Sequence, residues 1–328
     1  MKKLVLATAV AALSVTAAQA APTVYGKAFL TLDATTGDYE ERSALNSNAS
    51  RIGVRGSEAL TANTDVVYQL EYGVDVDADT NYRDDSSAKN QFYSRDTYLG
   101  LSNKQYGTLL AGRLSAIDGR VDYANVTQGG VMGGDNVLAS FDSPRANNAF
   151  AYIAPTYNDV TVSAMYVMDE NNGTDSLGRD AFGVAAQYEP TAPYRAGVSY
   201  IQAGDFNAVR VSGAYDLSPA TTIGALYQAT KDEENTTAFM DGTETESTFT
   251  LSAKHKVAQT PWTAYGQVDL VDNTTGVKDA ETQRLVVGGQ YAFNRATTGH
   301  IYAAGVREEL NSVKEDGAGF GAGLEYKF

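Results

Sequence analysis

The ten residues GFGAGLEYKF at positions 319–328 contain the pattern on which the fold depends. Large or apolar side chains occupy every second position from Phe320 to Phe328, and the positions between them hold glycine, Glu325 and Lys327. Successive side chains of a β-strand point to opposite faces, so this segment has one apolar and one polar face. The pattern predicts a strand that touches an apolar medium on one side and water on the other.

Comparable alternation recurs along the rest of the chain. Short connectors rich in turn residues alternate with longer acidic ones, and this sorting is typical of an antiparallel up-and-down barrel. About ten residues, at roughly 3.3 Å each and a tilt of about 40°, span about 25 Å, the height of an outer-membrane apolar band. We therefore predict an all-β transmembrane barrel of sixteen strands, at residues 24–33, 50–56, 64–76, 91–102, 106–113, 147–154, 159–168, 179–188, 194–202, 207–217, 220–230, 246–257, 262–271, 282–293, 299–306 and 319–328.

Basic residues inside these segments indicate what the second face touches. An Arg or Lys turned toward lipid at the middle of the bilayer costs about 2 to 4 kcal/mol. Alternation therefore places these residues on the inner face, and the barrel interior is predicted to be polar. The residues concerned are Arg51, Arg55, Arg195, Arg210, Lys254 and Arg284.

The N-terminal residues 1–20 have the plan of a cleaved signal peptide, with Lys2 and Lys3 before an apolar run and Ala18-Gln19-Ala20 at its end. Cleavage would change the formal net charge from -15 to about -17, which argues against nucleic acid as a partner. No second apolar run is long enough for a membrane-spanning helix. Cysteine is absent, so no disulfides staple the fold, and residues 21–328 are predicted to form the barrel.

Residues 114–146 break the alternating pattern. This interval is too long for an ordinary connection, and its apolar side chains, such as Val126 and Phe141, are more than a solvated segment would keep. Its glycines permit sharp bends. We expect it to pack against the barrel rather than extend into water.

With these segments in place, the chain resembles the general diffusion porins of Gram-negative outer membranes. The resemblance is carried by SRIGVRG at 50–56, SRDTYLGL at 94–101, YGTLLAGR at 106–113 and a last strand that ends in LEYKF. It implies a sixteen-stranded barrel whose third external loop, residues 114–146, folds inward and narrows the channel. It also implies a homotrimer, in contact with outer-membrane lipid and lipopolysaccharide.

The resemblance also implies roles for individual residues. Family members line one wall of the constriction with arginines and the opposite side with loop carboxylates. By position, the basic wall is Arg51, Arg55, Arg95 and Arg145, and the loop carboxylates are Asp118, Asp122 and Asp135. Arg113 is placed to anchor the loop, and Phe328 is similar to the signal read by the barrel-insertion machinery. The tip QGGVMGGD at 128–135 matches the family only loosely.

The predicted function is passive diffusion of ions and small hydrophilic solutes, without enzyme activity, cofactor or resident metal. The net charge and the acidic outer loops favour a weak cation preference. The same carboxylates suit Ca²⁺ or Mg²⁺ that bridges to lipopolysaccharide. These carboxylates are Asp77, Asp79, Asp84, Asp85, Asp232, Glu233 and Glu234.

Three alternatives stay open at this point. A solute-specific channel, such as a sugar porin, would use inward aromatic rings, for which Tyr25, Phe29 and Tyr265 are candidates. An enzyme embedded in a barrel would need a nucleophile and a base, and only His255 and His300 are available as histidine bases. A soluble secreted β-protein is the third alternative.

Overall fold

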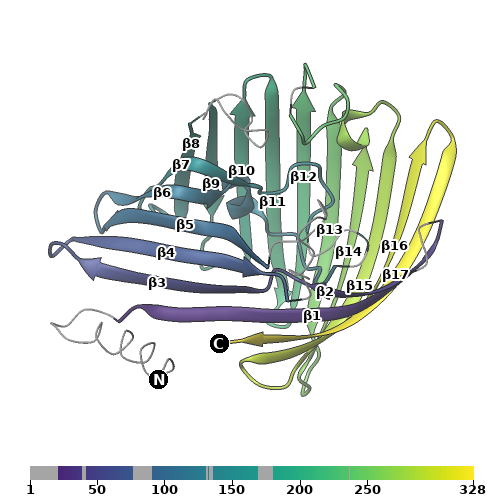
Figure 1. Ribbon diagram of the computed structural model, residues 1–328, viewed down its shortest axis with the longest axis horizontal. Helices are drawn as coiled ribbons and strands as arrows, with labels where there is room; N and C mark the ends of the chain where they lie inside the picture. Colours follow the sequence, from purple (N-terminus) through teal and green to yellow (C-terminus); the bar gives the residue numbers. More distant parts are fainter. Residues whose placement is uncertain are drawn as a thin grey trace, which may run out of the picture.

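The computed structural model describes residues 21–38, 42–76, 91–130, 132, 136–168, 180–235 and 237–328. Within these ranges the chain forms one antiparallel sheet that closes on itself, since the first strand pairs with the last (Figure 1). The predicted all-β barrel is confirmed. Its strands are β1 (Thr23–Gly37), β2 (Arg42–Ser47), β3 (Arg51–Ala59), β4 (Thr64–Val74), β5 (Phe92–Asn103), β6 (Gly107–Ser115), β7 (Arg145–Ile153), β8 (Val160–Val167), β9 (Ala181–Tyr188), β10 (Tyr194–Ala203), β11 (Phe206–Ser218), β12 (Thr221–Asp232), β13 (Glu246–Lys256), β14 (Trp262–Asp272), β15 (Glu281–Ala292), β16 (Thr297–Leu310) and β17 (Val313–Lys327).

Two short 3-10 helices, η2 (Ile117–Val121) and η3 (Thr274–Gly276), lie between strands. In the described part of the chain, neither these nor any other helix has the length and apolarity to cross a membrane.

The strands β2 and β3 make a single crossing of the barrel. Both pair with β1, β3 over residues 23–27 and β2 over residues 30–35. Between them Ala49 adopts a left-handed φ of 50°, and the Phe29 amide donates to Ser50 Oγ at 2.9 Å in place of a ladder bond. The described strands therefore make sixteen crossings, as predicted.

Two predicted loops are wrong in part. Residues 42–47 were expected in a loop over 34–49, and residues 307–318 in another, yet both contain strand. The second region is a long hairpin with a two-residue turn at Asn311-Ser312, where both φ angles are positive. Charged residues occupy both faces there, so the sequence shows no apolar alternation even though the strands continue.

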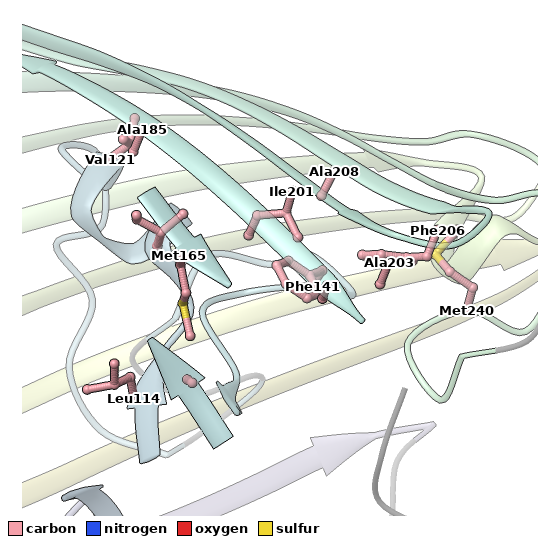
Figure 2. Packing of buried hydrophobic residues seen from close by; sticks show 13 residues of the cluster. Leu114, Val121, Phe141, Met165, Ala185, Ile201, Ala203, Phe206, Ala208 and Met240 are labelled. Carbon is pink, nitrogen blue, oxygen red and sulfur yellow. The ribbon is translucent and has the colours of Figure 1, made fainter. Parts of the chain in front are cut away.

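The exposed fractions of the side chains follow the predicted alternation. In β17, Phe320 is 66% exposed, whereas its neighbours Gly319 and Gly321 are buried. The inner face of the sheet is covered over β8–β11 by apolar side chains of the chain between β6 and β7 (Figure 2). Figure 2 shows Val121 beside Ala185 and Phe141 beside Ile201. A second polypeptide layer therefore lies on part of the barrel wall.

Candidate functional site

The chain between β6 and β7, residues 116–144, is called the inner loop below. Its backbone amides donate hydrogen bonds to strand side chains on the inner face of the barrel. Tyr123 donates to Ser212 Oγ at 3.0 Å, Val126 to Gln267 Oε1 at 3.0 Å, and Ser140 to Glu246 Oε1 at 2.9 Å. The acceptors belong to β11, β14 and β13 respectively. The inner loop thus follows the inner face of the barrel for several strands.

Near its tip the inner loop reaches β16. Gly129 has a φ of +93°, and a Cβ there would stand 2.2 Å from the ring of Tyr302. The hydroxyl of Tyr302 donates to Asp33 of β1, which also accepts from Asn46 Nδ2 at 2.6 Å. Only a glycine combines this backbone angle with this close approach. The described glycines of the tip, Gly129 and Gly130, are therefore fitted to β16 and to the side chains of β1 and β2.

Three of the predicted wall arginines lie on β3 and β5, the strands that flank β4 and its carboxylate Glu71. Arg95 Nε donates to Glu71 Oε1 at 2.6 Å, and Arg51 Nε lies 3.6 Å from Glu71 Oε2. The Arg55 guanidinium lies over the ring of Tyr25, 4.9 Å from its centroid, and no carboxylate of the described residues lies within 4.0 Å of it. This arginine wall of three cations and one anion has an excess of positive charge.

Arg145 lies in a separate pair. Its Nε donates to Asp96 Oδ1 at 2.6 Å, and Ser115 Oγ donates to the same oxygen at 2.9 Å. A register shift in the β4–β5 pairing places both Arg95 and Asp96 opposite Glu71. This bulge turns adjacent residues toward different partners. Sequence reasoning missed Glu71 and Asp96, although Glu71 could have been found because a carboxylate in the middle of a strand must also face inward.

Arg113 lies where the inner loop begins. Its Nη1 donates to Asn147 Oδ1 at 2.6 Å, and its Nε donates to the Ser94 carbonyl at 3.3 Å. These contacts join β6 to β7 and β5. The anchoring role implied by the resemblance remains a prediction.

The predicted loop carboxylates do not form one acidic face. Asp118 is 2% exposed, lies 3.3 Å from Arg210 Nη2 and accepts from the Ser143 amide at 3.0 Å, so it faces the wall and not the channel. Asp122 Oδ1 accepts from the amides of Ala124 and Asn125. Burial raises the pKa of both carboxyl groups, and the Arg210 charge opposes this shift only partly. Asp135 lies outside the described residues.

The described residues include only some of the carboxylates predicted for the outer loops. Glu233 is exposed and paired with Lys231 at 3.0 Å, but Asp232 is buried and accepts from the Thr237 amide at 2.7 Å. Among the described residues no cluster of three or more acidic or histidine side chains could hold a metal ion. The predicted signal peptide, residues 1–20, lies outside the described residues, as do Asp77, Asp79, Asp84 and Asp85.

Phe328 completes the barrel seam. Its amide donates to the Gly26 carbonyl at 3.1 Å, and the Gly26 amide donates back to the Phe328 carbonyl at 2.9 Å. The ring is exposed on the outer face beside that of Tyr326. His300, by contrast, is buried against the ring of Phe29, with a centroid separation of 4.6 Å.

Comparisons with known proteins agree with this architecture. A family model described as Gram-negative porin matches residues 6–327. The major outer membrane protein P.IB of Neisseria gonorrhoeae is 25% identical over 365 residues, and the alignment covers all of both chains. The anion-selective porin from Comamonas acidovorans is 18% identical with a TM-score of 0.72, and the match covers 94% of this chain and 99% of that one. In vitro folded OmpT of Vibrio cholerae, in its trimer form, is 15% identical with a TM-score of 0.68, with 94% and 100% covered. The family match spans nearly the whole chain, and the barrel is closed, so this chain belongs to the Gram-negative porins of the outer membrane.

Proposed function

We propose that this outer-membrane diffusion pore passes ions and small hydrophilic solutes with a weak preference for anions. The observation that carries the proposal is the arginine wall, in which Arg51 and Arg95 share the carboxylate of Glu71, while Arg55 lies over the Tyr25 ring with no carboxylate of the described residues within 4.0 Å. Because Asp118 is turned into the contact between the inner loop and the wall, it does not balance that charge across the channel. A passing anion therefore meets an excess of positive charge.

The expected preference is small. At about 8 Å in water, one unit charge acts on another with about 0.5 kcal/mol, and the screening length at physiological ionic strength is also about 8 Å. An uncompensated arginine therefore changes a permeability ratio by roughly twofold. This magnitude fits passive diffusion and not tight binding.

A cation preference is the second candidate. It is favoured by the formal net charge of -15 and by exposed outer carboxylates such as Glu233. Those charges act from the channel mouth, where salt screens them most, whereas the arginine wall lies beside the path of the solute. For this reason we place the arginine wall first.

A reversal potential measured across a KCl gradient in a planar bilayer tests the sign. We expect the reversal potential to lie toward the equilibrium potential of chloride. In Arg55→Ala we expect the anion preference to be smaller. The exposed Arg307, paired with Asp316, provides the matched control Arg307→Ala. A potential toward that of potassium would overturn the anion preference, and an absence of conductance would overturn the pore itself.

Two of the three aromatic rings that a sugar-specific channel would use are not accessible to a solute. Phe29 and Tyr265 are buried, so they offer no face to a sugar, and the Tyr25 hydroxyl donates to Glu71 Oε2 at 3.0 Å. Flux that saturates with sugar concentration would restore this alternative.

We also propose that the chain assembles as a homotrimer, because the similar OmpT of Vibrio cholerae occurs in a trimer form. Chemical cross-linking in mild detergent should give a trimer band, whereas a monomer alone would contradict the assembly. We further propose that the chain contacts lipopolysaccharide, in part through divalent bridges. We also propose that the insertion machinery recognises Phe328. Chelation should lower the thermal stability of the assembly if such bridges exist.

A further inference from the structure

Three lysines on β1, β13 and β17 reach into the barrel near the end at which β1 begins and β17 ends. Lys27 is directly opposite Lys327 in the β1–β17 ladder and directly opposite Arg51 in the β1–β3 ladder. Lys254 lies on β13, and β14, β15 and β16 stand between it and β17. Lys254 and Lys327 are nevertheless close enough for their charges to interact. The three long side chains therefore converge in the interior, beside the arginine wall.

A single carboxylate lies among these lysines. Glu325 Oε1 lies 2.7 Å from Lys327 Nζ, and Glu325 Oε2 lies 3.8 Å from Lys27 Nζ. Lys254 has no carboxylate of the described residues within 4.0 Å. Three ammonium groups and one carboxylate leave an excess of two positive charges. This charge matches a doubly charged anion better than chloride.

His300 lies beneath the lysines on the inner face of β16 and is 3% exposed. Its ring lies 4.6 Å from that of Phe29, and Lys27 Nζ lies 5.3 Å from the centroid of the Phe29 ring. The charges of all three lysines and of Glu325 act on the imidazole. Neither Nδ1 nor Nε2 has a hydrogen-bond partner among the described residues. Because buried polar atoms are nearly always hydrogen-bonded, this ring indicates a ligand that accepts a hydrogen bond.

We propose that Lys27, Lys254, Lys327 and His300 form a binding site for a doubly charged oxyanion, such as sulfate or hydrogen phosphate. This inference rests on the proposed function as an anion-preferring pore and names the solutes that the pore retains longest. Every ammonium and imidazole N–H group of the site is a donor, and the four oxygens of the anion are acceptors. Charge-assisted hydrogen bonds of this kind are roughly twice as strong as neutral ones. Glu325 weakens the site, so that a bound anion can leave and transport continues.

Sulfate titration in a planar bilayer tests the site. Potassium sulfate is added to a KCl solution at constant ionic strength, and the chloride current of the wild type should fall saturably. In Lys254→Gln the half-blocking sulfate concentration should rise roughly fivefold, because a charge that attracts a doubly charged anion is lost, although water and salt weaken its action. Lys314→Gln is the matched control, since this exposed lysine is paired with Glu309 in the β16–β17 hairpin, and it should be blocked like the wild type.

Glu325→Gln should change the block in the opposite direction. It removes the carboxylate of the site and keeps a side chain of the same size, so the half-blocking concentration should fall by a similar factor. A poorly folded channel cannot produce tighter block, so this variant tests the site even if Lys254→Gln fails to insert. A half-blocking concentration that stays the same or rises in Glu325→Gln would overturn the proposal.

His300→Leu tests the imidazole separately from the charges. The leucine keeps an apolar contact with Phe29 and removes both ring nitrogens, so the half-blocking concentration should rise about threefold, the effect of one lost hydrogen bond. An unchanged value would overturn the site as proposed, and so would an equal change in Lys314→Gln, which would assign the block to net charge. A wild type that conducts and prefers chloride but shows no saturable block contradicts this site alone. A wild type that prefers potassium or does not conduct contradicts the proposed function.

Discussion

The arginines of β3 and β5 and those of β11 and β15 are the same residue in one barrel, yet they lie in opposite environments. The Arg51 side chain is 31% exposed, and Arg55 lies over the Tyr25 ring with no ion-pair partner among the described residues. Arg210 and Arg284 are buried beneath the inner loop and bind its carbonyls and carboxylates. The difference shows that coverage by the loop decides whether an arginine stays partly exposed or becomes part of the buried contact between loop and wall.

The largest effect should come from the covered side. Arg210→Ala leaves Asp118 and Asp142 without their cation, and breaking a buried pair in this way costs about 3 to 5 kcal/mol. We expect a matching fall in the free energy of unfolding, measured by denaturant titration in detergent. Arg307→Ala removes an exposed arginine and should cost less than about 1 kcal/mol. Equal losses in the two variants would remove the distinction between the two sides.

A smaller effect is expected at the tip of the inner loop. In Gly129→Ala, the new Cβ would meet the Tyr302 ring and the backbone would keep an unfavourable positive φ, at a cost of about 1 to 3 kcal/mol. The tip should leave its position, and single-channel conductance should fall. Gly130→Ala is the matched control, because its Cβ would come close to a single side-chain atom, Asn48 Oδ1 at 2.9 Å, with its next neighbours at 3.8 Å, and should change conductance less. A larger loss in Gly130→Ala would contradict the fit described for the tip.

On the open side, Arg55→Ala should change selectivity and leave stability nearly intact. No carboxylate of the described residues lies within 4.0 Å of this guanidinium, so its removal leaves no buried partner behind. We expect the anion-to-cation permeability ratio to fall roughly twofold, with a stability change within about 0.5 kcal/mol. Reversal potentials and unfolding curves measure the two quantities. An unchanged ratio would show that the arginine wall does not face the solute.

The smallest effect is expected from pH. Burial raises the pKa of Asp122 in the docked loop, so the docked loop takes up a proton at a pH where a released loop stays ionised. Docking therefore strengthens as pH falls through the raised pKa and weakens above it. The lost negative charge should also raise the anion preference by less than about twofold, beginning above the usual aspartate pKa of about 3.9. Asp122→Asn should remove the part of this dependence that comes from Asp122, and the buried Asp118 should keep the rest. A fall in anion preference on acidification would have the wrong sign.

Sequence reasoning predicted the strands of the barrel better than the side-chain contacts inside it. Alternation alone turned Arg51, Arg55 and Arg284 inward, because lipid excludes charge from the other face. It could not show that a bulge sends Arg95 and Asp96 to different partners, since an inserted residue leaves no mark in composition. It also could not show that Asp118 turns to the wall, because that contact joins residues 92 positions apart.

The closure of the sheet has a consequence for the order of assembly. β1 pairs with β17 from Lys27–Lys327 to Gly37–Gly317, and Phe328 adds two backbone hydrogen bonds with Gly26. The pairing of β1 with β17 joins opposite ends of the described chain, so its loop-closure entropy cost is the greatest of any strand pairing. We therefore expect it among the slow steps of folding. Until it forms, the nascent sheet has two open edges that could recruit a neighbouring copy. Sealing the cylinder is therefore also the step that ends its vulnerability to aggregation.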